Sequence, residues 1–266
     1  MRQQAASREF FFQIFALILS LIMVHAIYVA LIRPNANAIM QAQLEREAAG
    51  EVVVAERSLY VVLKDYEQEA CFILMFWAMA IMGYKARRSL KERSLLQLKL
   101  IQIDEGSRIL PEDSRQLARP IQALPTEQQE YLLPRILSAA LQRFATTRNI
   151  QGVSEVSNDT CEKESDRLDS ELSMVRYIAW AIPSIGFIGT VRGIGEALGQ
   201  ADKAVQGDIA GVTAALGVAF NSTLIALVIS IVVMFLVHQL QLLQERLVLD
   251  SHSYVDSKLL RHLKTD

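Results

Sequence analysis

The stretch that decides the fold runs from Ile209 to Val237 and reads IAGVTAALGVAFNSTLIALVISIVVMFLV. It contains 29 residues and no Asp, Glu, Lys or Arg. As an α-helix it would be ~43 Å long, more than the ~30 Å hydrocarbon core of a bilayer. The stretch therefore predicts a transmembrane helix that is tilted or extends past the membrane.

Three further apolar stretches precede it, at Phe10 to Ile32, Ala70 to Tyr84 and Tyr177 to Leu198. The first is long enough to span a bilayer, whereas the second reaches only ~22 Å and needs Glu69 and Lys85 to snorkel. The predicted fold class is all-α, a polytopic inner-membrane protein with four transmembrane helices. The third and fourth helices are expected to be long and to extend into a cytoplasmic helical bundle.

The first stretch has a second interpretation as a cleaved signal peptide. Arg2 and Arg8 precede it, and Ala36-Asn37-Ala38 offers a small-residue cleavage site. Signal peptides have an apolar core of only ~7–15 residues, and this core is longer. We therefore favour an uncleaved anchor, while a cleaved residue 1–38 segment remains the alternative.

Charge sets the orientation and excludes one class of function. The 27 Lys and Arg nearly balance the 29 Asp and Glu, so there is no overall basic field to hold nucleic acid. Five basic residues directly follow the second stretch: Lys85, Arg87, Arg88, Lys91 and Arg93. Residues 33–69 carry seven acidic and four basic side chains. Basic flanks stay in the cytoplasm, so both termini are expected there.

These patterns predict six regions along the chain. They are an N-terminal anchor (1–32), a periplasmic helical segment (33–69), a second transmembrane helix (70–84), a cytoplasmic helical domain (85–176), a channel core of two transmembrane helices (177–240) and a cytoplasmic C-terminal helix (241–266). The periplasmic segment should be helical from Ala38 to about Tyr66, with an interruption near Gly50. In the cytoplasmic domain we expect breaks near Pro111, Pro120 and Pro125. The helix that starts near residue 159 should enter the third span unbroken.

Small residues line one face of the third span and one face of the fourth. The first face comprises Ala179, Pro183, Gly186, Thr190, Gly193 and Ala197, and the second comprises Ala215, Ala219, Thr223, Ala226 and Ser230. Spacings of three and four place each set on one side of its helix. Such faces usually let helices pack closely. The candidates for this packing role are Pro183, Gly186, Gly189, Gly193, Ala219 and Ala226.

Each face also carries a threonine near the middle of its span. Asn221 and Ser222 flank Thr223. Hydroxyls in membrane helices often bond to a carbonyl one turn earlier, which is a structural role. Two facing hydroxyls would instead line a narrow polar path for an ion, because a hydroxyl both donates and accepts. The candidate ion-pathway residues are Thr190, Thr223, Ser222 and Asn221.

Two other features of the third span have two interpretations each. Arg192 and Glu196 stand four residues apart, so they form either an interfacial ion pair or an ion entrance. Pro183 frees a carbonyl, which makes a hinge or is satisfied by a neighbouring helix.

The sequence lacks the groups that several other functions need. No Asp or Glu lies deep in a span, so an ion-binding acid would have to come from another polypeptide. The motifs G-x-S-x-G, H-E-x-x-H and the phosphate-binding loop are absent, and the two cysteines suit neither a disulfide framework nor a zinc site. We therefore predict that the chain is not an enzyme and binds no metal.

The segments Ile182 to Ile194 (IPSIGFIGTVRGI) and Leu216 to Ile231 (LGVAFNSTLIALVISI) resemble the MotA/TolQ/ExbB proton channel family. The resemblance covers about 80 residues, from near Asp166 to about Leu240. It implies an ion path at Thr190 and Thr223, and a pentamer around two copies of a single-span MotB-, TolR- or ExbD-like partner. A membrane Asp of that partner would carry a proton or a sodium ion while ring and partner rotate, and no cofactor is implied.

This sequence departs from the family pattern at two positions. TolQ- and ExbB-type chains carry a Glu where Val218 stands, and Arg192 replaces an apolar or small residue. Four spans are more similar to MotA than to the three-span TolQ and ExbB. The leading hypothesis is an ion-conducting stator subunit of an inner-membrane motor. The alternative is a non-conducting oligomeric scaffold whose cytoplasmic helices recruit partners.

Overall fold

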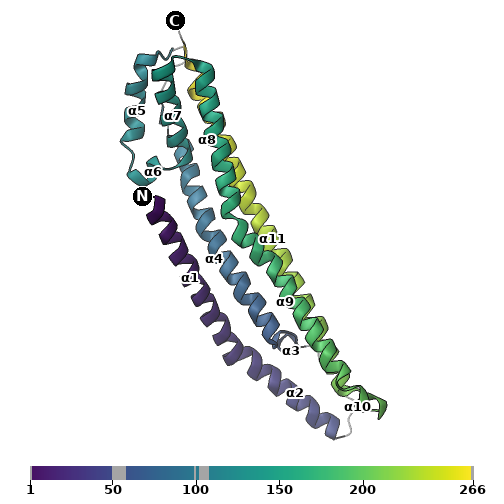
Figure 1. Ribbon diagram of the computed structural model, residues 1–266. Helices are drawn as coiled ribbons and strands as arrows, with labels where there is room; N and C mark the ends of the chain where they lie inside the picture. Colours follow the sequence, from purple (N-terminus) through teal and green to yellow (C-terminus); the bar gives the residue numbers. More distant parts are fainter. Residues whose placement is uncertain (1, 50–57, 99, 102–107, 265–266) are drawn as a thin grey trace. The chain divides into compact units, whose positions relative to one another are not determined.

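The computed structural model describes residues 2–49, 58–98, 100–101 and 108–264, and these residues are almost entirely helical (Figure 1). Within the described ranges the chain forms no strand, apart from one isolated bridge between Ile109 and Leu263. The predicted all-α class is confirmed.

The helices follow one another with short connections. In order they are α1 (Arg2–Ile27), the π-helix η1 (Tyr28–Ile32), α2 (Arg33–Ala48), α3 (Leu59–Leu63), α4 (Tyr66–Ser94), the 3₁₀ turns η2 (Leu95–Gln97) and η3 (Pro111–Asp113), α5 (Ser114–Gln122), α6 (Thr126–Gln129), α7 (Leu132–Thr147), α8 (Ile150–Glu171), α9 (Ser173–Leu198), α10 (Ala201–Val205), α11 (Ala210–Lys258) and the 3₁₀ turn η4 (Leu260–His262).

Four helical stretches of the described chain are long and apolar enough to cross a membrane. They are Arg8–Gln43, Tyr66–Gln97, Ile150–Leu198 and Ala210–His262. The prediction of four transmembrane helices, the last two of them long, is confirmed, and the chain is a multi-pass membrane protein. The short second apolar stretch of the sequence lies inside α4, whose 29 residues are enough to span the bilayer.

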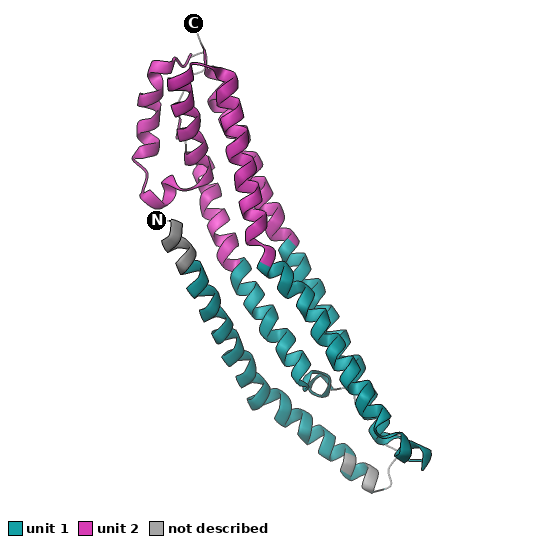
Figure 2. Cartoon of the chain, viewed as in Figure 1, with its two compact units in different colours: residues 1–82, 174–237 teal, residues 83–173, 238–266 magenta. Residues whose placement is uncertain are grey.

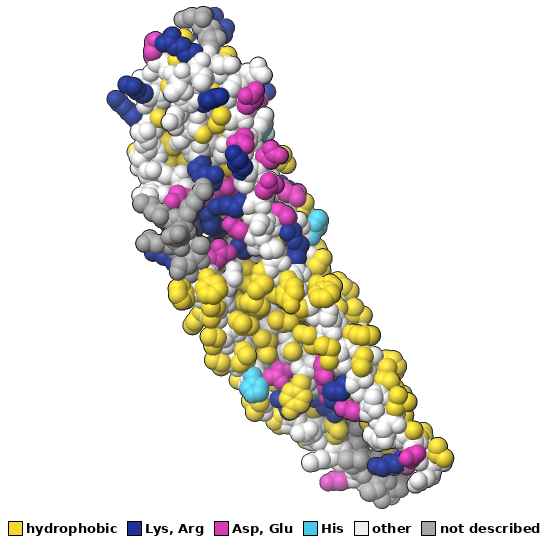
Figure 3. Space-filling view, viewed as in Figure 1, with side chains coloured by type: hydrophobic (Ala, Val, Ile, Leu, Met, Phe, Trp, Pro, Cys, Tyr) yellow, Lys and Arg dark blue, Asp and Glu magenta, His cyan; other side chains and the backbone are white. Residues whose placement is uncertain are grey.

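The chain divides into two compact units (Figure 2). Unit 1 comprises Met1–Met82 and Met174–Val237, and unit 2 comprises Gly83–Ser173 and His238–Asp266. Unit 1 exposes large apolar side chains on its long helices, among them Phe11 (67%), Phe187 (64%) and Phe235 (61%). Figure 3 shows one face of the molecule, with the hydrophobic side chains in yellow. Lipid is the solvent that suits such a surface, because the backbone polar groups are already bonded within helices.

Unit 2 has an apolar core of its own, built around α7. Leu137, Ala140 and Phe144 are fully buried, at spacings of three and four that place them on one helical face. Residues of α5, α8 and the end of α11 complete the core, among them Ile121, Val153 and Val255.

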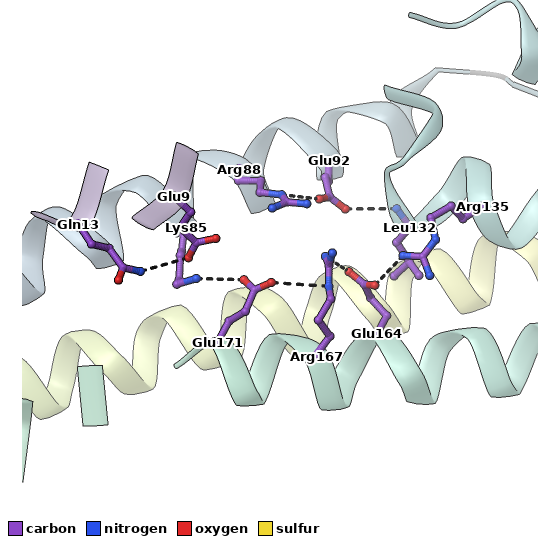
Figure 4. Close-up of polar contacts among 10 residues, drawn as sticks. All are labelled: Glu9, Gln13, Lys85, Arg88, Glu92, Leu132, Arg135, Glu164, Arg167 and Glu171. Carbon is purple, nitrogen blue, oxygen red and sulfur yellow. Dashed lines mark hydrogen bonds and ion pairs between the residues drawn. The ribbon is translucent and has the colours of Figure 1, made fainter. Parts of the chain in front are cut away.

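Charged side chains, most of them buried, link the helices of unit 2 to one another (Figure 4). Glu164, only 2% exposed, accepts hydrogen bonds from Arg135 at 2.8 Å and from Arg167. Glu171 on the same helix pairs with Lys85 at 3.0 Å, and Glu92 accepts the backbone N–H of Leu132 at 3.2 Å. A carboxylate removed from water needs such donors, so these contacts fix the register of α4, α7 and α8.

Two local predictions need correction. Pro120 does not break a helix but lies inside α5, whereas Pro111 opens η3 and Pro125 precedes α6. The helix expected to enter the third span unbroken is interrupted at Leu172, between α8 and α9. The periplasmic segment is helical in α2 up to Ala48 and again in α3, which agrees with the predicted helix, while Gly50 itself lies outside the described residues.

Candidate functional site

The small-residue faces of α9 and α11 pack against each other within one chain. Gly186, Gly189 and Gly193 are buried on α9, and Ala219 and Ala226 on α11 are fully buried. A Cβ at Gly193 would lie 2.7 Å from the carbonyl oxygen of Ala215 and 2.7 Å from the nitrogen of Ala219. Since real Cβ atoms do not approach backbone so closely, glycine sets this helix separation.

The two other glycines of this face make equally close contacts. A Cβ at Gly189 would lie 2.5 Å from the Cβ of Ser222, and a Cβ at Gly186 would collide with the Cβ of Ala226. The structure therefore brings the packing candidates of the two spans into one interface.

Thr190 and Thr223 meet in this interface. Their hydroxyls hydrogen-bond to each other, and both side chains are half-buried. Thr190 Oγ1 also donates toward the carbonyl of Ala219 (3.0 Å), and Thr223 Oγ1 toward the carbonyl of Gly186 (3.2 Å). Four oxygens thus gather at one point between two apolar helices, and each hydroxyl has only one proton to donate. Such a group can bind a small cation or pass a proton.

The flanking residues are placed differently. Ser222 is buried and donates to the carbonyl of Val218, one turn earlier, at 2.8 Å. This is the structural back-bond that such side chains often make. Asn221 is half-buried next to it. Neither residue makes a hydrogen bond to the threonine pair among those that the structure shows.

Pro183 does not interrupt α9, which continues through it. The carbonyl that a proline frees lies four residues earlier, on Ala179. That oxygen accepts a hydrogen bond from Ser230 Oγ of α11 at 3.2 Å. Of the two interpretations of Pro183, the structure therefore favours the carbonyl satisfied by a neighbouring helix.

Arg192 and Glu196 form the pair that their spacing predicts, at 2.9 Å. The stronger partner of the arginine, not predicted from the sequence, is Glu67 in the first turn of α4. Arg192 holds both oxygens of that carboxylate, with Nε at 2.7 Å and Nη2 at 2.9 Å. Two parallel bonds of this kind are the strongest arginine–carboxylate geometry. The acidic residues at the start of α4 were the signal in the sequence that an acidic partner for Arg192 was available there.

Residues 128–252 match the MotA/TolQ/ExbB proton channel family. The resemblance read from the sequence is thereby confirmed. The matched segment runs from α6 into α11, so it contains Thr190, Thr223, the three glycines, Arg192 and Glu196. No curated protein and no solved structure matches the chain.

A second group of charges lies in unit 1, outside the part that matches the MotA/TolQ/ExbB family. Glu69 of α4 is 6% exposed and pairs with Arg33 and with Nδ1 of His25, the latter at 2.7 Å. The Arg33 guanidinium also lies 4.3 Å from the ring centre of Tyr66. Side chains from α1 and α2 thus contact one buried carboxylate of α4, and the Arg33 guanidinium supplies the opposite charge.

Proposed function

We propose that this chain is an ion-conducting subunit of an inner-membrane motor complex, which carries protons or sodium ions and converts the ion-motive force into rotation or mechanical work. The observation that carries the proposal is the mutual hydrogen bond of Thr190 and Thr223 in a glycine-lined helix interface. Polar side chains inside membrane spans often mark ion routes, and ion passage is the use of this pair that fits the family.

The proposal requires a second polypeptide. A hydroxyl can orient or relay a proton but cannot store it near neutral pH, because it does not titrate there. The carboxylate that binds and releases the ion would come from a single-span partner with a membrane Asp. The resemblance to the family supports a pentamer of this chain around two such partners. The transported ion is the only small ligand in this scheme.

The charge pattern supports the orientation. Lys85 and the basic residues after it, in unit 2, would lie on the cytoplasmic side of an inner membrane together with both termini. The acidic segment before α4, with Glu67 and Glu69, would then face the periplasm. Arg192 and Glu196 would stand with Glu67 at the outer end of the ion route.

The decisive test removes the hydroxyls and keeps the shape. Thr190→Val and Thr223→Val should each lower ion uptake by about five- to tenfold, because each removes a hydrogen bond worth ~1–1.5 kcal/mol from the route. The tagged chain is purified with its native partner, reconstituted in liposomes and assayed with proton- and sodium-sensitive dyes. Thr213→Val is the matched control, because its hydroxyl lies on the same helix and bonds only to the carbonyl of Ile209.

A non-conducting scaffold is the second candidate, and one observation favours it. The hydroxyls of Thr190 and Thr223 are satisfied within the chain, as they would be in a purely structural interface. Under this function both valine variants would transport as the wild type does, and only variants that disturb helix packing would have an effect. Wild-type uptake by both variants would therefore reject the ion-path role.

A further inference from the structure

Close to the carboxylates of α4, three buried polar atoms of unit 1 have no hydrogen-bond partner among the residues that the structure describes. They are Tyr28 Oη in the π-helix η1, Asp65 Oδ2 just before α4, and Gln68 Oε1 in its first turn. Tyr28 is 1% exposed and Gln68 is fully buried. Buried polar atoms are almost always paired, so this group indicates a ligand. π-Helical turns are also frequent at functional sites.

The three residues belong to one neighbourhood. Gln68 Nε2 donates to the carbonyl of Val62 at 3.1 Å, and the amide also interacts with the carboxyl group of Asp65. The phenol of Tyr28 lies within electrostatic range of Asp65, Glu69 and Arg33. The Gln68 amide therefore lies against the carboxyl group of Asp65, and the Tyr28 phenol lies within electrostatic range of it.

The negative charges of Glu67 and Glu69 are each balanced by an arginine in contact with the carboxylate, whereas the charge of Asp65 is balanced less completely. Arg192 holds both oxygens of Glu67, and Arg33 with His25 holds Glu69. The charged groups that act on Asp65 itself are Lys64 beside it, Arg192 of α9 and Glu67 of α4. No described residue makes a hydrogen bond to its Oδ2. A proton on that oxygen would turn an unpaired acceptor into a donor, for which Gln68 Oε1 is a free acceptor.

We propose that Asp65 is a proton-binding site, in which Oδ2 takes up a proton from the aqueous phase and keeps it, and the O–H of the neutral carboxyl group donates a hydrogen bond to Gln68 Oε1. The carboxyl group changes from one negative charge to none, and Tyr28 closes the site on the side of η1. Binding of this proton does not require conduction. Its place as the first stop of an ion that enters from outside rests on the proposed function.

The electrostatics agree in direction. Burial raises the pKa of Asp65 above its ordinary value, and Glu67 adds to this, while Lys64, Arg192 and the Gln68 amide act against it. The neutral form is therefore held to a higher pH than in an exposed aspartate.

The test is an infrared titration of the purified full-length chain in lipid nanodiscs without any partner. The wild type should show the carbonyl band of a protonated carboxylic acid at pH values where exposed aspartates are ionised. Asp65→Asn should remove the Asp65 component of this band, while any component from other buried carboxyl groups such as Glu92 remains. Asp202→Asn, which changes an exposed carboxylate of α10 in the same unit, should leave the whole band in place. A band that is unchanged in Asp65→Asn overturns the proposal.

Two charge variants test the site without touching Asp65. Glu67→Gln should lower the midpoint of the band, because it removes a negative neighbour and frees Arg192. Arg192→Gln should raise it for the opposite reason. The proposal is overturned if the two midpoints shift in the same direction or do not shift. Circular dichroism checks that both variants keep the helicity of the wild type.

Repeating the titration with sodium in place of potassium, at constant ionic strength, separates the two cations. An unchanged midpoint supports a proton site, and a midpoint lowered by sodium overturns it in favour of a sodium site. Since no partner and no transport are involved, failure here leaves the threonine test untouched. Failure of the threonine test likewise leaves the titration of Asp65 valid.

Discussion

At the scale of single residues, the distance between α9 and α11 depends on glycines, which carry no side chain. At Gly193 the atoms that a Cβ would meet are backbone atoms of α11, which cannot rotate away. At Gly189 they are the side-chain atoms of Ser222, which have more freedom. The helix separation in turn brings the Thr190 hydroxyl within hydrogen-bond reach of the Ala219 carbonyl. The glycines thus determine the polar geometry.

Gly193→Ala should therefore destabilise the protein. Overpacking a close interface typically costs ~1–3 kcal/mol, and the rigid backbone contacts place this site within that range. Gly217→Ala on α11 is the control, because a Cβ there meets nothing within 4 Å and alanine favours the helix. Thermal unfolding followed by circular dichroism should show a lower Tm for the first variant only. Equal Tm values would mean that glycine is not needed at Gly193.

A second residue-scale prediction concerns the carbonyl freed by Pro183. Ser230→Ala removes the donor that satisfies Ala179 and should cost ~1–3 kcal/mol, the usual penalty for an unpaired buried group. Ser184→Ala should cost much less, since its hydroxyl bonds to the carbonyl of Trp180 on its own helix. Equilibrium unfolding in denaturant compares the two. Similar losses for both would show that the carbonyl finds another donor.

At the scale of elements, the two units rely on different contacts between helices. In unit 1 small residues let α9 and α11 approach, whereas in unit 2 an apolar core is joined by buried charges. Glu164 on α8 is 2% exposed and is bonded by arginines that reach it from α7 and from its own helix. One carboxylate therefore links two helices.

Glu164→Gln should loosen this link. The amide keeps the shape but leaves Arg135 and Arg167 without their charge partner, and we expect a loss of ~1–3 kcal/mol. Asp159→Asn on the same helix removes an exposed pair with Lys163 and should cost ~0–1 kcal/mol. Amide hydrogen exchange of α7 and α8 should accelerate in the first variant. Unchanged exchange would indicate that the apolar core alone holds these helices.

Periodicity and hydropathy were sufficient to predict the helices and the face that carries each threonine. Residues 210–237 of the last apolar stretch lie within α11, and the three- and four-residue spacing placed Thr190 and Thr223 on the faces that meet. The pairing of Arg192 with Glu67 was not predictable, because the two residues are far apart in sequence and nothing local selects among several acids near α4. The unpaired atoms of Asp65 and Gln68 are visible only after folding, since hydrogen-bond satisfaction is a property of the tertiary structure.

At the scale of the whole molecule, the sidedness of the chain in the membrane decides which groups can meet an incoming ion. The positive flank after the second span predicts that unit 2 faces the cytoplasm, and the connection from α9 through α10 to α11 should then lie on the opposite side. Asp65 and the pair of Arg192 and Glu67 can act on ions from outside only if this holds.

Cysteine labelling tests the sidedness. Asp202→Cys in α10 and Lys163→Cys in α8 replace exposed side chains, whereas native Cys71 and Cys161 are buried and give a low background. A membrane-impermeant maleimide applied to intact spheroplasts should label the first variant, and it should label the second only after lysis, because charged reagents do not cross the bilayer. Wild-type protein treated in the same way measures the background. The reverse pattern would place the acidic cluster in the cytoplasm, and Asp65 would then meet the ion at its exit instead of its entrance.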